Sequence, residues 1–202
     1  MKEKNILIIF TRNPRLGKVK TRLAKTIGNK KALEIYTLLL KKTAEVTAKV
    51  KADRVVYYSE DIVEDAVWSP AYFSKKIQKG NDLGERMMQA FKENFSKGYK
   101  NAVIIGSDMF DITPNHIEEA FQKLNTHNAV IGPAQDGGYY LLGLKKMHAE
   151  LFQHKKWGTN SVLRDTLEDL KTVDVALLEE LNDIDEYNDI KEHPAFQEFI
   201  NN

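Results

Sequence analysis

Runs of consecutive hydrophobic residues alternate along the chain with segments in which hydrophobic residues recur every three or four positions. Runs such as 5–10 and 102–106 are typical of strands that are buried on both faces of a parallel sheet. Segment 83–95, in which Met87 and Phe91 share one face, is typical of a helix. This alternation predicts an α/β fold with a mostly parallel, doubly wound sheet and helices on both faces.

The same pattern gives each expected element a range. Strands are predicted at 5–10, 54–58, 72–78, 102–106, 128–132, 139–144 and 173–176, with 139–144 as an antiparallel exception. Helices are predicted at 19–28, 30–50, 83–95, 114–124, 160–170 and 194–200, with Thr113 as the N-cap of the fourth. No internal repeat or interdomain linker interrupts this order, so residues 1–202 are expected to form a single domain.

Composition narrows the functional classes. The chain has no cysteine, which excludes disulfides and thiolate metal sites, and its five histidines lack the spacing of a zinc site. The first apolar run is too short to span a membrane and shows no signal-peptide cleavage pattern, so a cytoplasmic protein with no membrane span is expected. The net charge of +1 argues against a dedicated nucleic-acid binder. The oligomeric state cannot be predicted from the sequence.

The charges are unevenly distributed despite this balance. Six cationic residues and no acidic one lie between Thr11 and Lys25, directly after the first strand. In doubly wound sheets, ligands bind beyond the carboxyl ends of strands, and a helix N-terminus there favours phosphate. The predicted phosphate contacts are Arg12, Lys20 and Arg22, with Gly17 allowing close approach of the backbone. The segment does not fit GxxxxGK[ST], the phosphate-loop pattern of common ATPases. A solvated basic helix explains its position and charge equally well.

Carboxylates follow a central strand and recur near the C-terminus. Asp108 comes directly after strand 102–106, where it would suit a magnesium ion that is also held by phosphate oxygens. Asp111 is interpreted as a residue that stabilises the next turn. Asp183 and Asp185 point to the same side of an extended segment and offer further metal ligands. The alternative for these two is an exposed acidic cap before the next helix.

Two further motifs are candidates for substrate contacts. The turn Asp136-Gly137-Gly138 is typical of a hairpin, although the glycine backbone suits close approach to a substrate and Asp136 suits activation of an acceptor hydroxyl. Trp157 begins a segment that suits contact with a base or a sugar. Arg86 is either another anion contact or a surface ion-pair residue.

Six motifs, taken together and in order, resemble a known family. They are KTRL (20–23), NDLGERM (81–87), GSDMFD (106–111), GPAQDGGYYLLGL (132–144), WGTNSV (157–162) and DID (183–185). From about Ile6 to Ile190 the chain is similar to the small bacterial glycosyltransferase-like proteins of the GT-A nucleotide-diphospho-sugar transferase superfamily. Some members are designated arsenosugar-biosynthesis glycosyltransferases, and more distant relatives are 2-phospholactate and molybdenum-cofactor guanylyltransferases.

This resemblance implies a three-layer α/β/α GT-A fold, Rossmann-like, that uses Mg²⁺ or Mn²⁺. It places Asp108 at the family's metal-binding aspartate and Asp185, or its neighbour Asp183, at the late acidic motif. It places the phosphate contacts at Arg12, Lys20 and Arg22. The family usually has Cys-Pro after GSD, whereas this chain has Met109-Phe110, which affects the acceptor pocket more than the metal site.

The expected function is therefore a metal-dependent transferase, and above all a glycosyltransferase that takes a nucleoside-diphosphate sugar and a small-molecule acceptor. One alternative is a nucleotidyltransferase that moves NMP from an NTP to a phosphorylated small molecule. Another is a non-catalytic nucleotide-binding module. Nucleic-acid binding by the 12–25 cluster is not expected, because no aromatic residues interleave with it.

Overall fold

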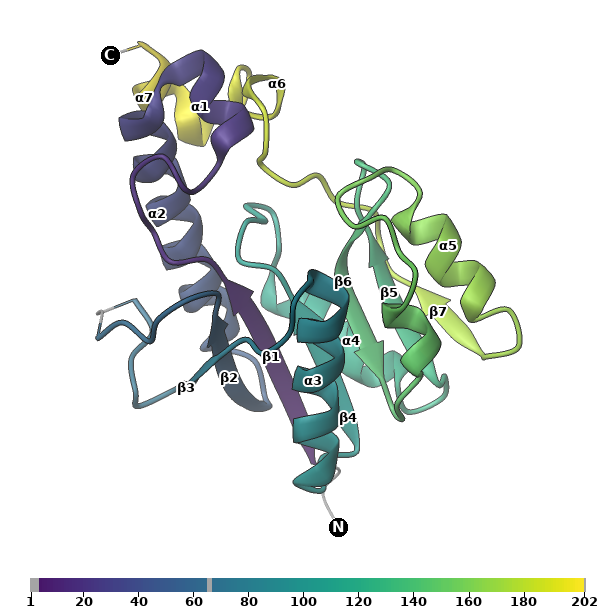
Figure 1. Cartoon of the computed structure of the whole chain (residues 1–202). Helices are drawn as coiled ribbons and strands as arrows, with labels where there is room; N and C mark the ends of the chain where they lie inside the picture. Colours follow the sequence, from purple (N-terminus) through teal and green to yellow (C-terminus); the bar gives the residue numbers. More distant parts are fainter. Residues whose placement is uncertain (1–3, 65–66, 202) are drawn as a thin grey trace.

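A computed structural model describes residues 4–64 and 67–201 and shows one mixed sheet with helices on both faces (Figure 1). The seven strands lie in the order β3-β2-β1-β4-β6-β5-β7. Their bounds are β1 Asn5–Thr11, β2 Asp53–Tyr58, β3 Ser74–Ile77, β4 Asn101–Ile105, β5 Ala129–Pro133, β6 Tyr139–Leu144 and β7 Val175–Leu177. All seven predicted strands are confirmed, with ends that differ from the prediction by at most two residues.

The sheet is parallel except around one strand. β1 pairs in parallel with β2 and β4, β2 pairs in parallel with β3, and β5 pairs in parallel with β7. β6 runs antiparallel to both β4 and β5, as the sequence predicts. The carboxyl ends of β1, β2 and β4 therefore meet at one edge of the sheet, which is where ligands of such folds bind.

The helices form the two outer layers. They are α1 Thr21–Ile27, α2 Asn29–Thr47, α3 Leu83–Ser96, α4 Pro114–Lys123, α5 Val162–Asp169, α6 Tyr187–Ile190 and α7 Gln197–Asn201, with 3₁₀ turns η1 Ala149–Phe152 and η2 Pro194–Phe196. Side chains of β1 alternate between the layers: Leu7 and Ile9 pack with residues of α2 and α4, whereas Ile8 packs with residues of α3 and η1. The predicted three-layer α/β/α architecture is confirmed.

A third apolar cluster lies beyond the carboxyl edge of the sheet. Its members come from both ends of the chain: Leu23 of α1, Ile35 and Leu39 of α2, and Ile184, Ile190 and Phe196 of the C-terminal segment. In Figure 1, α6 and α7 accordingly lie beside α1 and the nearby end of α2. Burial of these side chains holds the acidic C-terminal segment against the basic N-terminal one.

Some helix ends differ from the prediction for local reasons. α1 begins at Thr21 rather than near Val19, because Lys20 has a left-handed backbone with φ 46° and cannot extend the helix upstream. The expected terminal helix is a 3₁₀ turn followed by α7, and η1 was not predicted. Thr113 caps α4 as predicted, since its hydroxyl accepts a hydrogen bond from the His116 N–H at 3.5 Å. Among the described residues, no helix is both long and apolar enough to cross a membrane.

Candidate active site

A buried group of hydroxyls joins the ends of the two central strands. The Tyr36 hydroxyl, from α2, accepts a hydrogen bond from the Arg12 N–H at 2.9 Å and donates to the Arg12 carbonyl at 3.2 Å. It lies 3.3 Å from both Thr11 Oγ1 and Ser107 Oγ, and the Ser107 hydroxyl donates to Thr11 Oγ1 at 3.2 Å. These contacts fix where the chain leaves β1 and β4, directly before the cationic loop and before Asp108.

Two cations of the N-terminal segment, Lys20 and Arg22, form ion pairs with the predicted carboxylates. Lys20 Nζ lies 3.1 Å from Asp108 Oδ2 and 3.4 Å from Asp185 Oδ1. Arg22 Nη1 lies 3.1 Å from Asp185 Oδ2 and 3.6 Å from Glu186 Oε1. The structure thus brings Lys20, Arg22, Asp108 and Asp185 into one cluster, although they come from distant parts of the sequence.

Local contacts of the C-terminal segment place Asp185 in this cluster. The Ile184 N–H donates to the Asp108 carbonyl at 3.3 Å. The Asp189 carboxylate accepts hydrogen bonds from the backbone N–H groups of Asp185 at 2.9 Å and Glu186 at 2.6 Å, which shapes the turn. The Asp185 side chain is therefore held in position by the backbone on both sides of it.

The two residues that replace Cys-Pro have different environments. Phe110 is part of the anchor for the C-terminal segment, since its ring centroid lies 4.8 Å from that of His193 and 5.0 Å from that of Phe196. Met109 is buried and lines the cavity described below. Of the two, Met109 is therefore the one that shapes the cavity.

The electrostatics of the cluster favour its charged state. Burial opposes the charge of Lys20, whose side chain is 4% exposed, but Asp108 and Asp185 outweigh it and raise the pKa of Lys20. Burial likewise opposes ionisation of Asp108, but the Lys20 ammonium, and more weakly Arg12, lower the pKa of Asp108. Each charge is stable here because of its opposite neighbour.

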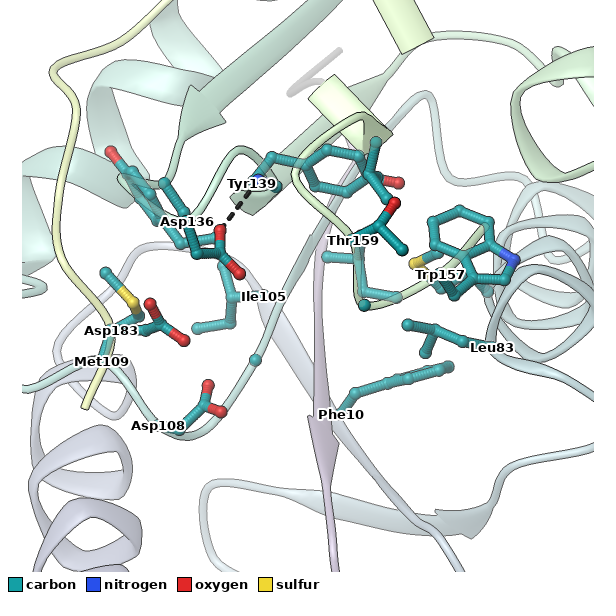
Figure 2. A pocket seen from close by; sticks show the side chains of 18 residues that line it. Phe10, Leu83, Ile105, Asp108, Met109, Asp136, Tyr139, Trp157, Thr159 and Asp183 are labelled. Carbon is teal, nitrogen blue, oxygen red and sulfur yellow. Dashed lines mark hydrogen bonds between the residues drawn. The ribbon is translucent and has the colours of Figure 1, made fainter. Parts of the chain in front are cut away.

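A cavity of about 270 Å³ opens beside Asp108 (Figure 2). It is lined by Phe10, Leu83, Met87, Ile104, Ile105, Gly106, Asp108, Met109, Ala134, Asp136, Gly138, Tyr139, Tyr140, Trp157, Gly158, Thr159, Val162 and Asp183. In Figure 2 the carboxylates of Asp108, Asp136 and Asp183 lie together on one side, whereas Phe10, Leu83 and Trp157 lie on the other. The cavity therefore has an acidic end and an apolar end.

The acidic end is electrostatically crowded. Burial, followed by the charges of Asp108 and Asp136, raises the pKa of Asp183 to about 6. Asp136 Oδ1 accepts a hydrogen bond from the Gly138 N–H at 2.8 Å. A ligand that donates hydrogen bonds to these carboxylates, or that brings positive charge, would relieve the crowding.

The apolar end depends on a glycine at the start of α3. A Cβ added to Gly84 would lie 2.4 Å from the Phe152 carbonyl oxygen and 2.8 Å from the Trp157 ring. Only a glycine lets the indole of Trp157 pack directly on the first turn of α3, beside Leu83. The NDLGERM and WGTNSV segments thus build one wall together.

The turn between β5 and β6 is a hairpin turn that also contacts the next helix. Gly137 has φ +86°, and a Cβ there would meet the Asn160 backbone at 2.4 Å. The Gly137 carbonyl accepts a hydrogen bond from the Leu163 N–H at 2.9 Å, which ties the turn to α5. Gly138 lines the cavity with Asp136, whereas Gly137 is not part of its lining and lies against the Asn160 backbone.

The other predicted contacts lie outside the cluster. Arg12 is exposed, and its backbone N–H and carbonyl, rather than its side chain, contact the Tyr36 hydroxyl. Gly17 has φ +72° and lies near the Asn29 side chain. Arg86 Nε donates to the Gly80 carbonyl at 3.1 Å, so the structure holds Arg86 against the loop that precedes α3.

Asp108 and Asp185 fit a divalent ion that arrives with a phosphate ligand. Among the described residues, no group of three or more His, Cys, Asp or Glu side chains is arranged to hold a metal ion. Asp108 and Asp185 nevertheless converge on a single cationic atom, Lys20 Nζ. Magnesium is commonly bound by one or two carboxylates, with phosphate oxygens and water completing its shell.

Several residues of the site were not predicted from the sequence. The apolar wall formed by Phe10, Leu83 and Met87 gave no signal, because these residues fit the core pattern of a strand or a helix. Tyr36 also fits the apolar face of α2. Asp189 could have been suspected only as part of an acidic run.

The fold is that of a nucleotide-diphospho-sugar transferase-like α/β protein. Residues 42–159 match the family model described as "Uncharacterized protein conserved in bacteria (DUF2064)", so the chain belongs to this family. Comparison with curated protein sequences gave no match.

Three solved structures illustrate the likeness. A protein of Desulfovibrio desulfuricans G20, provisionally named a nucleotide-diphospho-sugar transferase, is 31% identical over 98% of this chain and 91% of its own, with a TM-score of 0.86. 4-Diphosphocytidyl-2C-methyl-D-erythritol synthase of Anaerococcus prevotii DSM 20548 is 12% identical over 97% of both chains, with a TM-score of 0.63. Rv0371C of Mycobacterium tuberculosis H37Rv, solved in complex with manganese, is 11% identical over 93% of this chain and 96% of its own, with a TM-score of 0.54. The latter two show the shared fold alone.

Proposed function

We propose that this protein is a metal-dependent glycosyltransferase that moves a sugar from a nucleoside-diphosphate sugar to a small-molecule acceptor. The observation that carries the proposal is the cluster of Lys20 and Arg22 with Asp108 and Asp185, beside the cavity that Asp108 lines. Cations suited to a diphosphate, carboxylates suited to Mg²⁺ or Mn²⁺, and a pocket for the reacting group lie at one edge of the sheet. The name given to the 31% identical D. desulfuricans protein supports the same class of activity.

The lining of the cavity favours a sugar over a phosphorylated acceptor. Among the described residues that line it, none is Lys or Arg, whereas Asp108, Asp136 and Asp183 are all acidic. A phosphate group placed there would be repelled by Asp136 and Asp183, and no cationic side chain of the lining would offset this repulsion. A sugar ring is uncharged, so its hydroxyls can donate to the carboxylates while its C–H faces pack on Trp157 and Phe10.

In the proposed reaction, the acceptor hydroxyl oxygen attacks the anomeric carbon of the donor. The bond between that carbon and the diphosphate oxygen breaks, and the nucleoside diphosphate leaves with the bonding electrons. Asp136 is the candidate base for the hydroxyl proton. Lys20 and Arg22 stabilise the negative charge that develops on the diphosphate. Mg²⁺ or Mn²⁺, when bound, neutralises further charge on the same group.

Nucleotidyl transfer is the second candidate, since the chain shares its fold with a diphosphocytidyl synthase. In that reaction a phosphorylated acceptor attacks the α-phosphate of an NTP and pyrophosphate leaves. The two reactions are distinguished by their products. Release of nucleoside diphosphate from a sugar donor supports glycosyl transfer, and release of pyrophosphate from a labelled NTP supports the alternative. Metal-dependent binding with no turnover of any donor would identify a non-catalytic nucleotide-binding module.

The first experiment is a thermal-shift screen of nucleoside-diphosphate sugars and NTPs, with and without Mg²⁺ or Mn²⁺. We expect a metal-dependent shift with at least one sugar donor, and we expect Asp108→Asn to abolish it. The matched control is Asp111→Asn, three residues further on, whose half-exposed carboxylate lies 3.8 Å from His193. If Asp108→Asn keeps the full shift, the metal assignment is wrong.

A further inference from the structure

The ammonium group of Lys20 occupies the point on which the two carboxylates converge. Its Nζ lies 3.1 Å from Asp108 Oδ2 and 3.4 Å from Asp185 Oδ1. The Lys20 side chain is 4% exposed, whereas those of Asp108 and Asp185 are 41% and 28% exposed. The lysine side chain is therefore enclosed by protein, whereas both carboxylates are partly exposed.

The backbone directs Lys20 to this position. Lys20 has φ 46° and ψ 47°, a left-handed conformation that is uncommon for a residue with a side chain. Its carbonyl accepts the Ala24 N–H at 2.8 Å and so starts α1, and the preceding Val19 is buried. Because these contacts hold the backbone around Lys20, we expect the ammonium to leave the carboxylates by rotation of the side chain.

A divalent ion that bridged these carboxylates would compete with the ammonium for their oxygen atoms. Mg²⁺ and Mn²⁺ bind carboxylate oxygens, so an ion held by Asp108 Oδ2 and Asp185 Oδ1 would take the two oxygens that Lys20 Nζ contacts. The ion and the ammonium would not contact these oxygens together, because two neighbouring positive charges repel strongly in a partly buried site.

We propose that Lys20 acts as an internal competitor of the metal, occupying the site in the ligand-free protein and leaving it for the incoming diphosphate. This inference rests on the proposed metal site but not on the reaction that the site performs. The displaced ammonium gains phosphate oxygens as partners, so the two cations separate only when a diphosphate is present. Metal binding thereby becomes dependent on the nucleotide, and the donor enters as a metal complex.

The test is a titration of the ligand-free protein with Mn²⁺ alone, in which free Mn²⁺ is followed by electron paramagnetic resonance. If the ammonium leaves the carboxylates in fewer than about one molecule in ten, removing it tightens Mn²⁺ binding by at least about tenfold. We expect this gain in Lys20→Met and in Lys20→Gln, whose amide keeps a hydrogen-bond donor near the carboxylates. Lys18→Met, an exposed lysine of the same loop, should bind as the wild type does.

The outcomes separate this inference from the proposed function. Equal Mn²⁺ affinity in wild type and folded Lys20 variants overturns the competition, even if sugar transfer is confirmed. Micromolar binding of Mn²⁺ by the wild-type protein in the absence of nucleotide also overturns the competition, whether or not the variants fold. Conversely, tighter Mn²⁺ binding by the variants supports it even if no sugar donor is turned over.

Discussion

The hydroxyl group of Tyr36 offers a direct test of how the ends of β1 and β4 are held. Tyr36→Phe keeps the buried ring but removes the acceptor of the Arg12 N–H, which lies 2.9 Å away. Thr11 and Ser107 keep their mutual hydrogen bond at 3.2 Å, so one backbone donor is the main loss. An unsatisfied donor costs about 1–3 kcal/mol, and the lower half applies because this contact is only partly buried.

For a chain of this size, about 1–2 kcal/mol lowers Tm by about 2–8 °C. Thermal and urea unfolding should show this loss in Tyr36→Phe, together with weaker binding of any metal–nucleotide ligand, because the Arg12 and Asp108 loops lose a shared support. The matched control is Tyr72→Phe, whose residue is 55% exposed and whose stability should change by less than about 0.5 kcal/mol. A Tyr36→Phe protein as stable as the control would refute the reasoning.

Three further substitutions test other parts of the site. Gly84→Ala should cost about 1–3 kcal/mol and shift the fluorescence of Trp157, because its Cβ would overlap Phe152 and the indole; unchanged emission and Tm would contradict this. Gly137→Ala should lower the urea midpoint more than Gly158→Ala does, since both glycines have positive φ but only Gly137 faces backbone at 2.4 Å; equal midpoints would count against the hairpin–α5 contact. Asp183→Asn should raise the Tm of the ligand-free protein, because burial and the charges of Asp108 and Asp136 disfavour the ionised side chain. The gain in stability should be about 1 kcal/mol after solvent screening, and a lower Tm would exclude this explanation.

The hydrophobic pattern was sufficient to predict the layers of the fold. Runs such as Ile6–Ile9 are apolar at every position, so the strands they form must be covered on both faces. The same pattern placed Asp108 directly after a buried strand, at the edge where a ligand is expected. Strand ends were less predictable, because hydrogen bonding in the sheet decides them.

The hydrophobic pattern did not predict local backbone geometry. The left-handed conformation of Lys20 has no sequence signature, since lysine rarely adopts it. It moves the start of α1 and turns the side chain toward Asp108. The sequence shows that position 84 is a glycine, but it does not show why a glycine is needed there. The reason is the close approach of Trp157, which lies far along the chain.

The sequence by itself determined the α/β class, the order of the elements and the presence of a basic N-terminal and an acidic C-terminal segment. Only the tertiary structure decided that these segments meet. Lys20 and Asp185 are 165 positions apart and are joined because Leu23, Leu39 and Ile184 share one apolar cluster. Side-chain patterns report which face of an element is buried, whereas the identity of the partner depends on the packing of the whole chain.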